Sequence, residues 1–363
     1  MYLKRLYLMN YRNIAQADLQ FSPKLNWLVG RNGMGKTNVL DSIHYLSFCK
    51  SSLNPSDSQI LRHDADCMML DGTYQFENEE TTQISCSFRN GRKQFRRDHK
   101  DYRKFSDHIG LVPLVMICPD DISLISGSSE ERRRFMDLVI SQYDREYLNH
   151  LINYNKALAQ RNALLKLETM PDDEIFDMYE SVMDSCASVI FDRRREFVDN
   201  LIPRFRELYS RIGVSSESVG IGYISHLERG PLSVQLRDNR QKEHILGYSL
   251  HGIHKDDIEM TLDGYPIRRE GSQGQNKSYL TALKLAQYQY LTDACHGRKP
   301  ILLLDDLFDK LDPSRVERIL AIVSDNSFGQ IFITDADREH VDTVMKNSDS
   351  DCMVFNINNG EVE

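Results

Sequence analysis

The chain lacks the long apolar runs of a membrane protein. No hydrophobic stretch approaches the roughly 20 residues that a membrane-spanning helix needs. The opening residues, MYLKRLYLMNYRN, also lack the apolar core of a signal peptide. We therefore expect no membrane partner.

Cysteine is sparse and unpaired in its pattern. The seven cysteines are scattered along the chain, odd in number and without a CxxC motif. This pattern argues against a disulfide framework or a zinc site and favours a reducing, cytoplasmic compartment.

Repeats, low-complexity tracts and sustained heptads are also missing, which excludes solenoid repeats and a long coiled coil. What remains is a chain of 363 residues with ordinary composition, enough for two or three domains.

The strongest positive signal is the sequence GRNGMGKT at residues 30–37, which matches the phosphate-binding pattern GxxxxGK[ST]. Residues 25–29 ahead of it predict a buried strand, and the apolar spacing after it predicts a helix. Lys36 would place its charge on the β- and γ-phosphates of ATP, and the Thr37 hydroxyl can ligate Mg²⁺. A chance glycine turn before a helix is the alternative, and the flanking elements argue against it. The residues expected to contact ATP here are Gly30, Arg31, Asn32, Gly33, Met34, Gly35, Lys36, Thr37 and Asn38.

A second signal is ILLLDD at residues 301–306. Four apolar residues followed by two acids are typical of a central parallel strand with a metal ligand at its carboxyl end. We expect Asp305 to hold Mg²⁺ through water and Asp306 to orient or deprotonate the water that attacks ATP. A strand with an ordinary acidic cap is the alternative.

A third signal is GSQGQNK at residues 271–277. Ser272 and Gln275 form an S-x-x-Q capping box at a predicted helix start, and Gly274 leaves first-turn N–H groups open to an anion. Such helix starts are common, so the position just before ILLLDD is what makes this one informative. Ser272, Gly274 and Gln275 are therefore further candidates for nucleotide contact.

The net charge of −9 means that a DNA surface must come from local clustering. Residues 89–104 provide one, with eight lysines and arginines against two aspartates on a predicted hairpin that turns at Asn90-Gly91. A solvated edge hairpin is the alternative. The candidates for DNA contact are Arg92, Lys93, Arg96 and Arg97. The arginines of the helical region, by contrast, suit a solvated face or ion pairs: Arg193, Arg194, Arg195, Arg204 and Arg206.

Strand patterns at both ends of the chain enclose a helical middle. The expected organisation is residues 1–120 as the N-terminal part of an ATPase lobe, 121–245 as a helical lobe and 246–363 as the remainder of the ATPase lobe. Within the helical lobe, residues 173–212 predict a helix that breaks near Pro203.

The order of these motifs resembles that of ATP-binding cassette ATPases, and more narrowly that of the RecF family, which is related to SMC head domains. The residues that carry the resemblance are LYLMNYRN (6–13), LVGRNGMGKTNVLDSIHYLS (28–47), PDDISLISGSSEERRRFMD (119–137), HGIHKDD (251–257), GSQGQNK (271–277) and LLLDDLFDKLD (302–312).

The resemblance implies an α/β fold, an ABC-type P-loop ATPase head with a mixed sheet and an inserted, mainly helical lobe. It further implies the cofactors ATP and Mg²⁺, an ATP-dependent homodimer with Ser272 acting on the partner's γ-phosphate, slow hydrolysis, single-stranded or gapped DNA, and a RecR-type mediator as partner. The chain departs from the family at Ile253 and Lys255, where proline and arginine are usual, and at KSSLN (50–54), where serine-phenylalanine-arginine is usual.

Two other functions fit part of the pattern. A P-loop kinase for a small molecule would use the phosphate loop, with Arg132 to Arg134 as a lid, but would leave SQGQ unused. A transporter ATPase subunit would couple to a membrane segment and would usually carry glutamate in place of Asp306.

Overall fold

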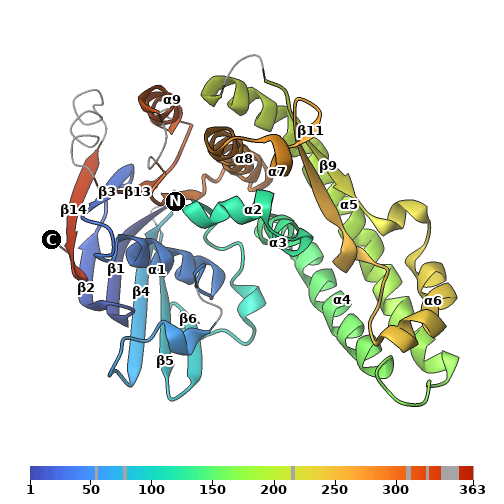
Figure 1. Ribbon diagram of the computed structural model, residues 1–363. Coiled ribbons are helices and arrows are strands. Elements are labelled where there is room, and N and C mark those ends of the chain that lie inside the picture. The colour runs from blue at the N-terminus through green and yellow to red at the C-terminus, as the bar shows by residue number, and fades with distance from the viewer. Residues whose placement is uncertain are drawn as a thin grey trace. The chain divides into compact units, whose positions relative to one another are not determined.

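The computed structural model describes residues 1–53, 56–76, 80–213, 217–307, 312–323, 327–336 and 351–362. The chain divides into two compact units, Met1–Asp121 with Leu283–Glu363, and Ile122–Ala282 (Figure 1). The sequence placed the second boundary at 245/246, whereas the structure places it at 282/283. Within the described residues, no helix has both the length and the apolarity required to cross a bilayer.

The first unit contains two six-stranded sheets. One is antiparallel, in the order β2-β1-β4-β5-β6-β7, and the other is mixed, in the order β15-β14-β3-β13-β12-β8 with parallel pairing from β14 to β8. Its elements are β1 (Tyr2–Tyr11), β2 (Ile14–Gln20), β3 (Leu25–Val29), α1 (Lys36–Phe48), β4 (Cys67–Gln75), β5 (Thr81–Arg89), β6 (Arg92–Arg97), β7 (Lys100–Asp101), β8 (Leu114–Ile117), β12 (Ile301–Leu304), α9 (Pro313–Val323), β13 (Ile331–Asp335), β14 (Cys352–Asn358) and β15 (Glu361–Val362).

Helix α1 contacts both sheets, touching β1, β4 and β5 of the antiparallel sheet and β8 and β13 of the mixed sheet. Eleven of its thirteen residues are buried. A helix that is buried on every side has no solvent face, so its polar residues need partners inside the protein. The phosphate loop leads directly into this helix and is therefore held at the centre of the unit.

The second unit packs helices against a three-stranded antiparallel sheet of order β11-β10-β9. Helix α5 runs unbroken through Pro203, so the predicted break is wrong. Proline has no N–H to donate to Asp199, and the helix loses one backbone hydrogen bond there without ending. The elements are α2 (Ser123–Ser126), α3 (Ser129–Ile140), α4 (Arg145–Leu164), α5 (Asp173–Ile212), β9 (Val219–Ile224), α6 (Leu232–Leu246), β10 (Asp257–Leu262), β11 (Tyr265–Pro266), α7 (Ile267–Glu270) and the first part of α8 (Gln273–Ala294).

The HGIHKDD segment joins the second unit through its two aspartates. Asp256 accepts a hydrogen bond from buried Arg194 of α5 at 2.8 Å, and Asp257 forms an ion pair with Arg132 of α3 at 2.6 Å. Together with the pairing of β10 with β9, these contacts explain why residues 246–282 belong with the helices. The expectation of ion pairs is confirmed for Arg193 and Arg195 as well, which bind Asp144 and Asp192 respectively.

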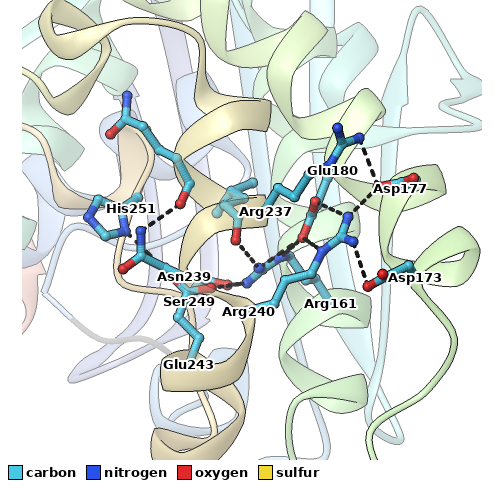
Figure 2. A network of polar contacts seen from close by, with 12 residues as sticks. Arg161, Asp173, Asp177, Glu180, Arg237, Asn239, Arg240, Glu243, Ser249 and His251 are labelled. Atoms are coloured by element: carbon cyan, nitrogen blue, oxygen red, sulfur yellow. Dashed lines mark hydrogen bonds and ion pairs between the residues drawn. The ribbon is translucent and has the colours of Figure 1, made fainter.

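A second buried network connects α4, α5 and α6 (Figure 2). The guanidinium of Arg161 lies 2.9 Å from Glu180 and 2.6 Å from Glu243, and all three side chains are almost completely buried. Arg240 binds Glu180 at 2.5 Å and Asp173 at 2.8 Å. Buried charges are tolerated only when they are paired, so these contacts fix how the three helices pack.

Replacing Arg161 by methionine should leave Glu243 buried without its close cation. We expect Arg161→Met to lower the free energy of unfolding by about 3–5 kcal/mol. The control is Arg237→Met, because Arg237 makes a largely exposed pair with Asp177 and should contribute less than about 1 kcal/mol. Urea titrations followed by far-UV circular dichroism measure both, and equal losses would contradict this role of the network.

Candidate nucleotide-binding site

Three parallel strands bring the predicted motifs to one edge of the mixed sheet. Strand β13 pairs with β3 on one side and with β12 on the other. The carboxyl end of β3 leads into the phosphate loop, that of β12 into Asp305 and Asp306, and that of β13 carries Thr334 and Asp335. In open α/β sheets, ligands bind outside the carboxyl ends of the strands.

The phosphate loop curves around the ammonium of Lys36. Its Nζ donates to the carbonyls of Gly30 at 2.6 Å and Arg31 at 3.2 Å, and to the Asn32 side chain at 3.3 Å. Gly35, at the start of α1, has φ of 114°, in the region that favours glycine. The charge of Lys36 therefore lies within the loop, where the motif predicts the phosphates.

The candidate metal ligands Thr37 and Asp305 are in contact. The Thr37 hydroxyl donates to Asp305 Oδ1 at 3.0 Å, and the Thr334 hydroxyl donates to the same oxygen at 2.8 Å. Burial raises the pKa of the Asp305 carboxyl to about 6, against the opposing effect of these two hydrogen bonds. Hydroxyl and carboxylate oxygens are the hard donors that Mg²⁺ prefers, so the residues present fit this ion.

Thr334 contacts both aspartates, although it is not among the candidate site residues named from the sequence. Besides binding Asp305, its hydroxyl accepts a hydrogen bond from the backbone N–H of Asp306 at 2.9 Å. The sequence signal for it is the apolar stretch at residues 331–333, which predicts a strand that ends at Thr334. Asp306 itself has φ of 41°, an uncommon left-handed conformation for a non-glycine residue. Strained backbone of this kind is concentrated at functional sites.

Two hairpins brace the phosphate loop at Met34. The Met34 carbonyl accepts from the Asn13 side chain at 3.1 Å and from the Gly360 N–H at 2.9 Å. Asn13 also accepts from the Asn38 side chain at 2.7 Å. Neither Asn13 nor Gly360 is among the site residues predicted from the sequence, although Asn359-Gly360 between two strands is a hairpin signal.

The Asp41 carboxylate organises the residues around the start of α1. It is fully buried and accepts hydrogen bonds from Tyr11, Arg12, Ser51 and Ser52. Ser51 and Ser52 lie in the KSSLN stretch, where the chain departs from the RecF pattern. The KSSLN stretch therefore contacts α1 through Asp41, although its sequence differs from the family pattern.

The predicted capping box is present at the start of α8. The Ser272 hydroxyl accepts from the Gln275 N–H at 3.2 Å, and the Gln275 side-chain oxygen accepts from the Ser272 N–H at 2.8 Å. Ser272 is exposed, and Gly274 is partly exposed. These residues belong to the second unit and the phosphate loop to the first. The stretch LLLDDLFDKLD ends in Leu311-Asp312, and Leu311 lies outside the described residues.

The basic hairpin forms as predicted, but one of its four candidates faces inward. The ammonium of Lys93 binds Asp57 at 2.8 Å and the Cys49 carbonyl at 2.8 Å, and lies over the ring of Tyr45. Alternation along β6 places Lys93 on the same face as buried Phe95. The charge of Lys93 is therefore neutralised inside the unit, and Arg92, Arg96 and Arg97 are the better candidates for DNA contact.

The other three candidates, Arg92, Arg96 and Arg97, are exposed. Arg96 and Arg97 make exposed pairs with Asp101 and Asp98. Arg92 lies directly opposite Arg89 in the β5–β6 ladder. Like charges opposite one another destabilise a sheet, so this arrangement favours a surface that meets an anion.

Comparisons with known proteins agree with this geometry. The family model of the RecF/RecN/SMC N-terminal domain matches residues 2–362. The DNA replication and repair protein RecF of Parabacteroides distasonis is 51% identical over 363 residues, which cover 100% of this chain and 99% of the relative.

Solved structures show the same likeness. The recombination mediator protein RecF with ATP, in the RecFOR pathway, is similar with a TM-score of 0.89 and 26% identity, over 100% of this chain and 97% of that one. The SMC head domain of Pyrococcus furiosus is similar in fold with a TM-score of 0.59 and 17% identity, over 100% and 95% of the two chains.

The bracing of Met34 can be tested with two equivalent turns. A Cβ at Gly360 would lie 2.3 Å from the Asn13 carbonyl, whereas a Cβ at Gly91 would meet nothing within 4 Å. Both glycines follow asparagine and have positive φ, so both substitutions strain the backbone equally in kind. We expect Gly360→Ala to weaken ATP binding roughly tenfold through loss of a loop hydrogen bond, and Gly91→Ala to leave it unchanged. Calorimetric titration with ATP measures both, and unchanged affinity in Gly360→Ala would exclude the brace.

Proposed function

The chain belongs to the RecF/RecN/SMC N-terminal domain family and, within it, to the RecF proteins. From that premise we propose that it is an ATP-dependent DNA-binding protein of recombinational repair and replication-fork maintenance. It binds single-stranded or gapped DNA, dimerises on ATP and uses slow, DNA-dependent ATP hydrolysis as a switch. Its fold is the predicted α/β fold of an ABC-type ATPase head with a mixed sheet and a mainly helical lobe.

One contact carries the proposal, the hydrogen bond from the Thr37 hydroxyl to Asp305. It joins two motifs that are 268 positions apart in the sequence. The phosphate loop and ILLLDD each have an alternative, structural explanation when considered alone. Here their residues are in contact and together provide the oxygen donors that Mg²⁺ requires. This coincidence supports nucleotide binding by the first unit.

The roles of the residues follow from their positions. Lys36 holds the β- and γ-phosphates, while Thr37 and Asp305 hold Mg²⁺, which neutralises phosphate charge when it is bound. Asp306 orients the attacking water, and Thr334 fixes both aspartates relative to β13 through its hydroxyl. The protein contributes positioning and charge, which is what phosphoryl transfer demands.

Dimerisation would complete the site. The phosphate loop alone would surround the phosphates of a bound ATP. The exposed helix start at Ser272 would then have no anion left to bind in that loop. In a two-fold dimer the same patch of each copy meets the nucleotide of the other. ATP would bridge the copies through its γ-phosphate, whereas ADP would not, which makes association a switch.

The basic hairpin supplies the charge for a phosphate backbone, through Arg92, Arg96 and Arg97. A RecR-type mediator remains the expected protein partner. The seven cysteines are all free, which fits the cytoplasmic location that we propose.

A small-molecule kinase is less well supported. Its lid would need free arginines at 132–134, but Arg132 is paired with Asp257 and Arg133 donates to the Asp256 carbonyl. The transporter alternative gains no support either, because this chain has Asp306 where such a subunit would usually carry glutamate.

The first test is the size of the protein in solution. We expect a dimer with ATP and Mg²⁺, and a monomer with ADP or without nucleotide, because only ATP offers a γ-phosphate to the second copy. Lys36→Ala should remain monomeric throughout while keeping the parental circular dichroism spectrum. Light scattering after gel filtration measures this, and a nucleotide-independent mass for the parent would overturn the switch.

Asparagine substitutions at Asp305 and Asp306 should affect ATP binding and ATP hydrolysis differently. We expect Asp306→Asn to bind Mg-ATP and to dimerise, but to hydrolyse ATP at least roughly a hundredfold more slowly, because the water loses its positioning group. Asp305→Asn should instead require a higher Mg²⁺ concentration for ATP binding itself. Titrations of ATP binding and turnover against Mg²⁺ distinguish them, and identical behaviour would refute the division of roles.

The hairpin should determine the salt dependence of DNA binding. Replacing Arg92, Arg96 and Arg97 by alanine should weaken binding to every sequence and reduce the slope of log K against log salt by up to about 3. Lys93→Ala is the matched control, and should lower stability while leaving the slope unchanged. Fluorescence anisotropy across salt concentrations provides the slopes. An unaltered slope in the triple variant would show that the hairpin is a solvated edge that does not bind DNA.

A further inference from the structure

The capping box of α8 is hydrogen-bonded to the carboxylate of Glu217, which lies outside the sequence motifs described above. The Gln275 side-chain nitrogen donates to Glu217 Oε1 at 2.8 Å, and the Tyr209 hydroxyl donates to Glu217 Oε2 at 2.5 Å. Glu217 lies just before β9, and Tyr209 lies in the last turn of α5. A chain of hydrogen bonds therefore runs from α5 through Glu217 and Gln275 to Ser272.

Glu217 determines which way the Gln275 amide points. A carboxylate only accepts hydrogen bonds, so the amide must turn its NH₂ group toward Glu217. The amide oxygen must then face the other way, where it accepts from the Ser272 N–H. With the amide reversed, NH₂ would face N–H at that position and the reciprocal cap would be lost.

The orientation of the Gln275 amide fixes the Ser272 backbone N–H, and the Ser272 hydroxyl closes the cap from the other side. The Ser272 oxygen accepts from the backbone N–H of Gln275, so the hydroxyl proton is not used by the cap and can donate to a ligand. Aromatic packing holds the same region in place, because Tyr279 of α8 contacts Phe205 and Tyr209 of α5 edge to face. The Tyr279 hydroxyl also donates to the Gly220 carbonyl of β9 at 2.7 Å.

We propose that Glu217 is a positioning residue for the composite nucleotide site, and that it sets the Ser272 hydroxyl and the first N–H groups of α8 for the γ-phosphate held by a second copy. This inference rests on the proposed ATP-dependent dimer. Glu217 acts through Gln275 and does not itself touch the nucleotide. A negative charge near a phosphate would by itself weaken association, so a positioning role and a purely electrostatic one have opposite signs.

Three variants separate these roles. In Glu217→Lys the ammonium can only donate, so it selects the reversed amide and breaks the cap. In Glu217→Gln the side-chain oxygen still accepts from Gln275. In the double variant Glu217→Lys with Gln275→Glu, the introduced carboxylate accepts from both the introduced ammonium and the Ser272 N–H, which rebuilds an S-x-x-E capping box.

The measurement is the protein concentration at half-dimerisation in ATP and Mg²⁺, by analytical ultracentrifugation. We expect Glu217→Lys to raise it at least tenfold with unchanged ATP affinity of the monomer, Glu217→Gln to resemble the parent, and the double variant to recover. Hydrogen exchange at residues 271–276 without nucleotide should be faster in Glu217→Lys alone. Urea midpoints within error of the parent's exclude general destabilisation.

Tighter dimerisation of Glu217→Lys would show that charge dominates and would overturn the proposal, as would failure of the double variant to recover. A parent that does not dimerise with ATP would instead refute the proposed function, and the exchange data would still report whether Glu217 controls the cap.

Discussion

The ATPase unit depends on one carboxylate oxygen, Asp305 Oδ1, which accepts hydrogen bonds from Thr37 and Thr334. These three residues stand at the ends of β12, α1 and β13, so the contact fixes three elements at the edge where the phosphate loop begins. Burial raises the pKa of Asp305, and the helix that carries Thr37 is itself buried against both sheets. The carboxylate that we propose as a metal ligand is thus also a structural centre of this edge, and Thr334 connects it to the backbone of Asp306.

The second unit relies on buried charge as much as on apolar packing. Arg194 binds Asp137 and Asp256, and Arg161 binds Glu180 and Glu243, all within its helices and the segment between β9 and β10. Paired buried charges cost desolvation but tolerate few alternative arrangements, which suits a lobe that must present a helix start in one orientation. Ser272 lies close to the C-terminal end of the segment that forms this unit. Helix α8, which begins directly after it, extends past that end into residues of the first unit.

The sequence alone was sufficient to predict those features that a short local pattern determines. The phosphate loop, the acidic strand end, the capping box and the Asn90-Gly91 turn all occur as predicted, because each is set by neighbouring residues. Helix α6 was missed because two of its four buried residues are Arg240 and Glu243, which leave no apolar periodicity to detect. The inward face of Lys93 was missed for a related reason, since its partner Asp57 is remote in the sequence. Thr334, Asn13 and Gly360 act through contacts across strands, and a local turn or strand-end signal does not predict those contacts.

The central claim is that two copies share each nucleotide, and mixing two inactive variants tests it most directly. Ser272→Arg should bind ATP as a monomer without dimerising, and Lys36→Ala should not bind ATP. A mixed dimer would contain one site with both defects and one with neither. In mixtures whose heterodimers are verified with tags of different size, we expect ATP hydrolysis to recover to as much as half that of the parent dimer. Verified heterodimers without activity, or a Ser272→Arg protein that hydrolyses ATP at the parental rate alone, would contradict the account.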